Sequence, residues 1–192
     1  IKIKGEKEKF NIKALNHEEG IEIILNKLLD PKYDVLSDLS EISAVGHRMV
    51  HGGEKFTESV LIDDDVIKQV EKLIYLAPLH NPSCLAGVLA MQKILPNVPM
   101  VAVFDTAFHQ TMPPVAYIYN IPYKYYEENG IRKYGFHGTS HRYVTQRVAE
   151  VLGKKPEDLN IISCHLGQGA SICAVEKGKS IDTSMGLIPL AG

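Results

Sequence analysis

Residues 42–50 read ISAVGHRMV and residues 98–104 read VPMVAVF, and these two apolar stretches decide the fold. Short, continuous runs of this kind are typical of strands that are buried on both faces of a sheet. Between them the apolar spacing predicts one helix that begins at 63–65 and ends before Pro78, and a second over 81–95. Strands that alternate with helices pair in parallel through crossover connections, so the sequence predicts an α/β fold.

The flanking segments extend this pattern in both directions. Residues 1–12 alternate apolar and charged side chains like one solvent-facing strand, and apolar residues then recur at helical spacing over 21–29. Residues 109–134 are rich in Pro and Tyr, a composition that resists regular structure. We therefore place a domain boundary at the start of this segment, between a first unit over 1–109 and a second over 110–192.

The C-terminal part predicts a helix followed by three strands. Thr139 or Ser140 caps the helix, which ends at Gly153. Its predicted inner face consists of Tyr143, Val144, Val148, Val151 and Leu152. The strands are predicted over 160–166, 170–176 and 179–184.

Composition and charge exclude several classes of protein. Of the 192 residues 45% are hydrophobic and 23% are charged, which excludes a disordered, collagen-like or coiled-coil chain. With 21 basic and 23 acidic residues the net charge is -2, so we expect no nucleic-acid partner held by bulk charge. The 3 cysteines stand at unrelated spacings and form neither a disulfide framework nor a CxxC pair. This cysteine usage fits a reducing compartment.

The sequence carries no membrane or targeting signal. Its apolar runs fall short of the ~18 residues that a membrane span needs, and no basic segment followed by an apolar one opens it. We therefore expect a cytoplasmic protein without membrane contact. The first residue is Ile1 rather than Met, inside a predicted strand, and Gly192 follows no polar tail. From this we expect a piece of a longer protein.

Polar residues at the ends of the two buried strands are the first candidates for a site, because ligands of open α/β sheets collect beyond the carboxyl ends of the strands. Arg48 offers a bidentate fork for a carboxylate or phosphate, although an arginine in such a place often pairs with a neighbouring acid. Asp105 offers a hard oxygen ligand for Mg²⁺, or else caps a helix. Gly52-Gly53, after the first strand, would let a ligand approach the backbone.

Two glycine-containing segments add phosphate-binding geometry. In GFHGTSH (135–141), His137 precedes a helix N-terminus, where free N–H groups favour an anion; the alternative is a capping turn. In HLGQGAS (165–171), backbone N–H groups of a hairpin could surround phosphate oxygens; the alternative is a plain turn. Arg, His, Asp and a glycine-lined loop together suit phosphoryl transfer, which needs positioning and charge neutralisation.

Histidine spacing leaves a rival chemistry open. His47 with His51, and His137 with His141, stand four residues apart, as zinc ligands on a helix do. Neither pair has the neighbouring Glu of an HExxH motif, and the first pair falls on a predicted strand. A zinc-binding domain therefore stays a second hypothesis.

Five ordered blocks stand out along the chain: GHRMVHGGE (46–54), APLHNP (77–82), VFDTAFHQTMP (103–113), YGFHGTSH (134–141) and HLGQGAS (165–171). Together they resemble the acetate kinase (acetokinase) family over nearly the whole chain. The resemblance implies the actin-like ATPase superfamily, whose core is a duplicated ribonuclease H-like unit. On this reading 1–109 is the latter part of the first unit, and 110–192 holds a linker helix and the opening strands of the second. The expected fold is therefore an incomplete actin-like ATPase fold.

The resemblance also implies roles, transferred position by position. Arg48 would bind the carboxylate or acyl phosphate, Asp105 would serve the Mg²⁺ site, and His137 would stabilise the transferring phosphoryl group. Phosphate contacts would come from His165, Gly167, Gln168, Gly169 and Ser171. The pocket for the substrate methyl group, with an imidazole beside it, would comprise Val50, Leu79, His80, Phe136 and Pro189.

The implied reaction is reversible transfer of the γ-phosphoryl group of ATP to acetate, which yields acetyl phosphate and ADP. The resemblance further implies a Mg²⁺ cofactor, a cytoplasmic location and a homodimer in the complete enzyme. A propionate kinase is the nearest alternative, although Val50 favours the smaller acid. A catalytically inactive fragment is the alternative from another class.

Several positions depart from the family's pattern. Gln168 stands where the family has Asn, and Ile188 and Ala191 replace a hydroxyl and an acid in the family's TPLEG. The family's opening strand with its phosphate loop is absent from this sequence, as are the second catalytic Arg, the adenosine site and a late metal-binding Glu. About half of a complete enzyme is thus expected.

Overall fold

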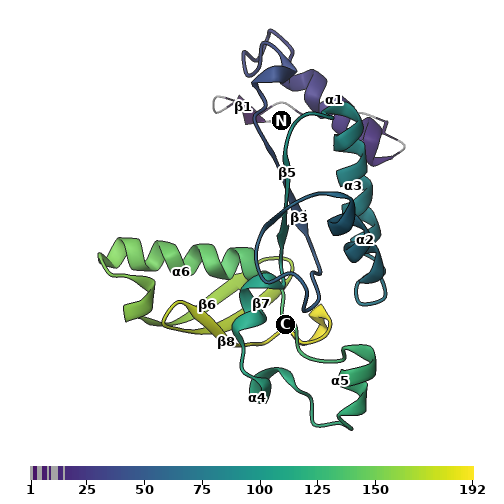
Figure 1. Ribbon diagram of the computed structural model, residues 1–192. Coiled ribbons are helices and arrows are strands. Elements are labelled where there is room, and N and C mark those ends of the chain that lie inside the picture. Colours follow the sequence, from purple (N-terminus) through teal and green to yellow (C-terminus); the bar gives the residue numbers. More distant parts are fainter. Residues whose placement is uncertain (1, 4–5, 8, 10–12, 15) are drawn as a thin grey trace.

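A computed structural model describes residues 2–3, 6–7, 9, 13–14 and 16–192 of the chain (Figure 1). The N-terminal part holds a small sheet with helices α1 to α3, and the C-terminal part holds a second sheet with helix α6. The architecture is mixed α/β, as predicted. Among the described residues, no helix is both long and apolar enough to cross a membrane.

The first sheet confirms the predicted parallel pair. Strands β3 (Val45–Met49) and β5 (Met100–Phe104) are parallel and in register, and each is shorter than its predicted segment. The unpredicted strand β4 (Val60–Leu61) pairs antiparallel with the other edge of β5. Helices α2 (Asp64–Lys72) and α3 (Asn81–Ile94) form the crossover and lie beside β3 and β5 (Figure 1).

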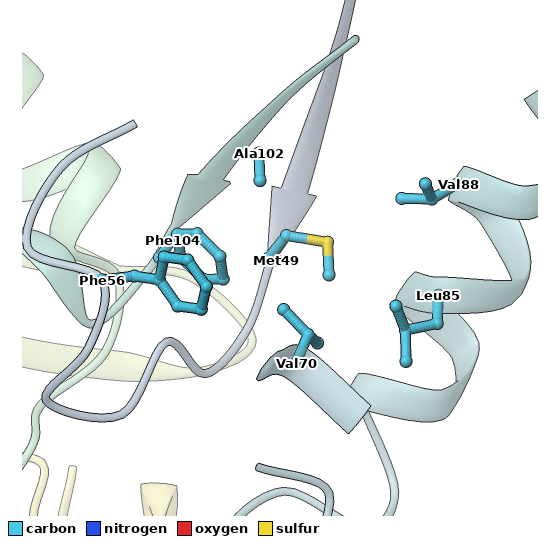
Figure 2. Packing of buried hydrophobic residues seen from close by; sticks show 7 residues of the cluster. All are labelled: Met49, Phe56, Val70, Leu85, Val88, Ala102 and Phe104. Atoms are coloured by element: carbon cyan, nitrogen blue, oxygen red, sulfur yellow. The ribbon is translucent and has the colours of Figure 1, made fainter. Parts of the chain in front are cut away.

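Side chains from these elements form the main core, shown in Figure 2. Phe56 and Phe104 stack with ring centroids 4.3 Å apart. A Cβ on Gly52 would lie 2.9 Å from ring carbons of Phe104 and 2.9 Å from the Cβ of Phe56. A Cβ on Gly53 would lie 2.8 Å from Cδ2 of Leu73. Packing against the core therefore accounts for both glycines, which the sequence had marked as a place for a ligand. The cluster comprises Met49, Phe56, Val70, Leu85, Val88, Ala102 and Phe104.

Capping explains where the helices begin. Asp63 caps α2 by accepting a 2.8 Å hydrogen bond from the Val66 N–H, as predicted. Helix α3 begins at Asn81, as predicted, and His80 occupies its cap position without a side-chain hydrogen bond. The Asn81 side chain accepts a 3.2 Å hydrogen bond from the His51 N–H at its Oδ1 and donates a 3.1 Å hydrogen bond from its Nδ2 to the His51 carbonyl. This exchange fixes the chain where it leaves β3.

At the N-terminal end, helix α1 (His17–Leu28) confirms the predicted helix, with Asn16 as its cap. The expected single strand over 1–12 lies partly outside the described residues. Its described part forms two strands, β1 (Lys2–Ile3) and β2 (Glu6–Lys7), which pair antiparallel. The prediction of one continuous strand was therefore wrong. Alternation indicates strand residues but does not indicate where the chain folds back.

The Pro- and Tyr-rich segment is more regular than predicted. The 3₁₀ helix η2 (Ala107–Thr111) overlaps its start, and the segment contains the short helices α4 (Pro114–Tyr117) and α5 (Lys124–Asn129). Pro114 starts a helix because its missing N–H is not needed in the first turn. Further 3₁₀ turns are η1 (Leu39–Glu41), η3 (Pro156–Asp158) and η4 (Pro189–Ala191). The domain boundary between 1–109 and 110–192 stays a prediction.

The second sheet confirms the three predicted strands almost residue for residue. Strands β6 (Asn160–Leu166), β7 (Ala170–Glu176) and β8 (Lys179–Thr183) form an antiparallel meander. Helix α6 (Gly138–Leu152) lies along this sheet (Figure 1). It begins before the predicted caps Thr139 and Ser140.

The predicted inner face of α6 was wrong in part. Val144 and Val148 are half-buried, but Tyr143, Val151 and Leu152 are 61, 76 and 57% exposed. The buried positions between them are His141, Thr145 and Ala149. The opposing sheet face presents the buried residues Ser163, Ser171, Cys173, Val175 and Ser180. His141 meets the hydroxyl groups of this face, because its two ring nitrogens lie 2.9 and 2.8 Å from the hydroxyl oxygens of Ser163 and Ser171.

Candidate functional site

The carboxyl ends of β3 and β5 bring Arg48 and Asp105 together. The Arg48 guanidinium donates from Nε to Oδ1 of Asp105 at 3.2 Å and from Nη2 to Oδ2 at 2.5 Å. The Asp105 side chain is 2% exposed, whereas that of Arg48 is 62% exposed. The hydrogen bond with Asp105 raises the pKa of Arg48 against the opposing effect of burial. Arg48 is therefore anchored along one edge, and much of its guanidinium still faces solvent.

The backbone of Asp105 joins the strand ends to helix α6. Its N–H donates to the Met49 carbonyl, and its own carbonyl accepts from the Gly138 N–H, both at 2.9 Å. A Cβ on Gly138 would lie 2.2 Å from the Asp105 carbonyl oxygen, so this approach requires glycine. His137, which precedes Gly138, adopts φ +58°. The sharp turn places His137 within electrostatic reach of Arg48 and Asp105.

The His137 imidazole is held from two sides. Its ring stacks on that of His165 with centroids 4.0 Å apart and an angle of 23°. Its Nδ1 lies 2.8 Å from the Ser171 hydroxyl oxygen. Burial, followed by the neighbouring His165, lowers the pKa of His137. The ring is therefore neutral at neutral pH.

The loop between β6 and β7 lies against these two rings. The Gly167 N–H donates to the Gly169 carbonyl at 3.1 Å, which closes a tight turn. A Cβ on Gly169 would lie 3.2 Å from Cε1 and Nε2 of His137, and one on Gly167 would lie 3.3 Å from Nε2 of His165. The structure thus brings together His137, His165 and both glycines of the predicted phosphate loop. Gln168 is exposed at the tip of the loop.

Ser171 belongs to the same region, but its hydroxyl faces inward. The residue is 2% exposed, and its oxygen lies 2.8 Å from Nδ1 of His137 and 2.8 Å from Nε2 of His141. The side chain therefore lies within a histidine network rather than on the open surface of the loop. Both ring nitrogens of His141 contact serine hydroxyls of this network. The sequence suggested His141 only as a zinc ligand.

The predicted apolar pocket is only partly assembled. Val50 and Phe136 are buried together with Met185, and Cys84 packs against them. Leu79 is 83% exposed, and His80 and Pro189 are exposed as well. Met185 was missed because a single methionine after a strand carries no signal of a site. The structure therefore provides one wall of a small apolar site.

The four-histidine zinc hypothesis finds no support in the geometry. In residues 2–3, 6–7, 9, 13–14 and 16–192, no group of three or more His, Cys, Asp or Glu side chains could hold a metal ion. Both nitrogens of His141 lie at 2.8–2.9 Å from serine hydroxyls, those of Ser163 and Ser171. Nδ1 of His51 accepts a 3.0 Å hydrogen bond from the Gly53 N–H. These nitrogens already have the partners that a metal would need to replace.

Arg132 is a further polar residue that the sequence did not single out. Its side chain is 4% exposed and donates to Oε1 of Glu54 at 2.6 Å. Its guanidinium carbon lies 3.6 Å from the centroid of the Tyr117 ring. Arg132 thus joins the Pro- and Tyr-rich segment to the HGGE end of the first block.

Comparison with known proteins places this geometry in context. A sequence profile described as the acetokinase family matches residues 1–192. The chain is 63% identical over 187 residues to an acetate kinase from Caldanaerobacter subterraneus subsp. tengcongensis, covering 97% of this chain and 47% of that protein. It is 58% identical to an acetate kinase from Bacillus subtilis over 192 residues, covering 100% and 48%.

Solved structures agree with the sequence comparison. The chain matches an acetate kinase from Porphyromonas gingivalis with a TM-score of 0.93 and 50% identity, covering 98% of this chain and 47% of that one. It matches a propionate kinase from Francisella tularensis subsp. tularensis with a TM-score of 0.83 and 49% identity, covering 90% and 43%. The chain therefore spans about half the length of the relatives it matches.

Proposed function

The chain belongs to the acetokinase family, and from this membership we propose that it provides one side of the active site of an acetate kinase. The reaction would transfer the γ-phosphoryl group of ATP reversibly to acetate, giving acetyl phosphate and ADP. The observation that carries the proposal is the convergence of three features in one place. These are the anchored Arg48, the neutral ring of His137 and the glycine loop over 167–169.

Arg48 would bind the anionic oxygens of acetate or of the transferring phosphoryl group. Asp105 fixes one edge of its guanidinium, so the remaining N–H donors are oriented before the substrate arrives. An oriented guanidinium suits phosphoryl transfer, in which charge develops on oxygens that the enzyme must neutralise.

His137 would donate a hydrogen bond to the phosphoryl group. Its Nδ1 is bonded to Ser171, and its Nε2 lies beside Gly169 in the proposed phosphate loop. The backbone N–H groups of this loop and His165 would contact further phosphate oxygens. Gln168, at the exposed tip, would reach the phosphates in place of the Asn that is usual in the family.

The residues also fit a share of a Mg²⁺ site. A carboxylate accepts about four hydrogen bonds or metal bonds, and Arg48 donates two to Asp105. Mg²⁺ is usually held by one or two carboxylates together with phosphate oxygens and water, and it neutralises phosphate charge when bound. Asp105 would therefore hold it jointly with the nucleotide. The family resemblance further supports ATP binding, a cytoplasmic location and a homodimer.

A propionate kinase is the second candidate. The solved propionate kinase is 49% identical to this chain and the Porphyromonas gingivalis acetate kinase 50%, so identity does not separate the two substrates. The buried Val50 favours acetate, because its side chain, which packs with Phe136 and Met185, would reduce the space for the substrate's alkyl group. Leu79, His80 and Pro189 would complete this pocket in the assembled enzyme.

The Arg48→Ala variant of the protein expressed from the complete reading frame tests the proposal. Acetyl phosphate formation, measured as the hydroxamate, should fall by about 10³ to 10⁵ because an arginine on the transferring phosphoryl group contributes that much. Arg147→Ala is the matched control, since Arg147 is also an exposed, ion-paired arginine, and it should stay within about twofold. Unfolding of both variants should be followed, because Arg48→Ala leaves the buried Asp105 unpaired. Activity of Arg48→Ala within a few-fold of the parent would refute the assignment.

A further inference from the structure

A single serine hydroxyl connects His137 to a second, fully buried histidine. The Ser171 oxygen lies 2.8 Å from Nδ1 of His137 and 2.8 Å from Nε2 of His141. His141 is 0% exposed, and its Nδ1 lies 2.9 Å from the Ser163 hydroxyl. The four side chains thus form an unbranched line of hydrogen bonds from β6 through α6 and β7 to the imidazole in the proposed active site.

The number of protons restricts what this line can do. A hydroxyl has one proton to donate, so Ser171 can donate to one of its two histidines and must accept from the other. If Ser171 donates to Nδ1 of His137, that nitrogen is bare, and the proton of the neutral ring lies on Nε2. Nε2 of His141 must then carry a proton and donate it to Ser171, while Ser163 donates to Nδ1 of His141.

In the alternative arrangement every hydrogen bond of the line has its donor and acceptor exchanged. His137 would donate from Nδ1 to Ser171, and its neutral ring would present a bare Nε2 to the loop at Gly169. A lone pair at that place would repel a phosphate oxygen, whereas an N–H would bind it. Only the first sense therefore prepares His137 for an anionic substrate.

We propose that His141 is a positioning residue which, through Ser171, holds His137 in the tautomer that carries its proton on Nε2. This inference rests on the proposed function and extends it to residues that do not touch the substrate. The arrangement resembles other catalytic histidines in which the partner of one ring nitrogen fixes the proton on the other. It also gives Ser171 a role different from the phosphate contact that the resemblance implied.

The contacts around the line support a positioning role. His141 is neutral at neutral pH, because burial followed by the neighbouring histidines lowers its pKa to about 4. It therefore keeps one donor and one acceptor nitrogen, as the line requires. The stacking of His165 on His137 prevents the ring from turning away from Ser171. His165 is itself fixed by a 2.9 Å contact between Nδ1 and the Ser140 hydroxyl.

The first test needs no substitution in the line. Nitrogen-15 NMR of histidine-labelled protein from the complete reading frame distinguishes protonated from bare ring nitrogens, and a His137→Gln sample identifies the His137 signals. We expect a proton on Nε2 and a bare Nδ1 in both His137 and His141 at neutral pH. A proton on Nδ1 of His137 would overturn the inference. This measurement does not depend on acetate kinase activity, so a failure of the proposed function would be seen separately.

The second test compares two buried serines. Ser171→Ala removes the connection, whereas Ser180→Ala removes an equally buried hydroxyl, which lies 2.9 Å from Nδ1 of His109. We expect Ser171→Ala to mix the His137 tautomers and to lower kcat about 10- to 30-fold with little change in either KM. Ser180→Ala should leave kcat within about threefold and the His137 tautomer unchanged. Equal losses of kcat in the two variants, or an unchanged tautomer in Ser171→Ala, would show that the serine only supports packing.

Discussion

His51, a residue of the first block, lies buried against aromatic side chains. The side chain is 0% exposed, accepts from the Gly53 N–H, and lies edge-on to Tyr134 with centroids 4.5 Å apart. Burial, followed by the charge of Arg132, lowers its pKa to about 4. The imidazole is therefore held neutral in the folded chain, which couples the stability of this region to pH.

This coupling predicts that stability falls on the acid side. Between pH 6.5 and about 4 the unfolded chain binds a proton at His51 and the folded chain does not, so the free energy of unfolding decreases as pH falls. His141, whose pKa is also lowered to about 4, acts in the same direction. Each histidine removes up to about 3 kcal/mol by pH 4. Urea denaturation at pH 7.0 and 5.0 measures the effect.

The His51→Asn variant isolates the contribution of His51 from those of the other histidines whose pKa is lowered. The Asn side-chain oxygen can replace Nδ1 as the acceptor for the Gly53 N–H, but the side chain does not titrate. We expect the loss of unfolding free energy between pH 7.0 and 5.0 to be smaller in this variant than in the parent. An identical loss in both proteins would mean that His51 is not the group responsible.

From the position of Val50 we expect the enzyme to prefer acetate over propionate by a modest factor. Because Val50 is buried with Phe136 and Met185, Val50→Ala should open the apolar wall and improve propionate relative to acetate. One methylene in an apolar pocket changes specificity by about 10- to 200-fold, so the ratio should shift by no more than this. Hydroxamate assays with both acids measure it, and Val151→Ala, the same change at an exposed site on α6, is the control. A ratio that stays the same in Val50→Ala would exclude Val50 from the pocket.

Among the elements, the start of α6 does most to assemble the site. His137 and Gly138 were expected to lie ahead of a helix capped at Thr139 or Ser140, but the helix starts at Gly138 itself. The Gly138 N–H bonds the Asp105 carbonyl, so the helix is joined directly to the end of β5. The distance between Asp105 and His137 is therefore set by a backbone contact that has no room for a side chain.

Glycine substitutions in two helices should consequently have opposite effects. Gly138→Ala forces a Cβ to within 2.2 Å of the Asp105 carbonyl oxygen and should destabilise the protein by about 1–3 kcal/mol while lowering activity. Gly87→Ala, in the interior of α3 with nothing within 4 Å of its Cβ, should stabilise the protein by about 0.5–1 kcal/mol. Thermal unfolding of both variants measures the difference, and destabilisation by Gly87→Ala would contradict this account.

The second sheet, β6 to β8, has one buried face and one exposed apolar face. Its face toward α6 is buried, whereas Ile162, Ile172 and Ile181 on the opposite face are 68, 47 and 37% exposed. Such a cluster of large apolar side chains on a sheet is normally covered by another layer. Since the relatives are about twice as long, we expect the remaining length of the family's fold to cover this face.

For the whole molecule, the proposed function predicts that the 192 residues are inactive alone. Phosphoryl transfer needs charge-stabilising groups on both sides of the γ-phosphate, and this chain would supply only the side with Arg48, Asp105 and His137. We expect no ATP-dependent acetyl hydroxamate from the purified 192-residue chain. Protein from the complete reading frame should form it readily.

The exposed apolar faces add a second readout to the same comparison. The 192-residue chain should bind a hydrophobic dye such as ANS more strongly than the longer protein and unfold at a lower temperature. Comparable turnover by both proteins would show that the short chain completes its site in another way, for example by association of two copies.

The sequence by itself determined those elements that depend on local spacing. Apolar runs predicted β3, β5 and the meander of β6 to β8, and capping residues predicted α2, because these signals arise from neighbours along the chain. The family resemblance of the sequence blocks implied that His137, His165 and the loop over 167–171 serve one phosphate site; the structure places His165 and Gly169 beside His137, and their roles stay a prediction.

Tertiary structure alone decided how these residues are used. Arg48 is anchored by Asp105 across 57 positions of sequence, and the Ser171 hydroxyl turns inward to two histidines instead of toward the loop. His141 of α6 is buried because the sheet opposite it carries the two serines whose hydroxyls it contacts. Such choices depend on which faces meet when distant elements pack, and periodicity within one element does not contain that information.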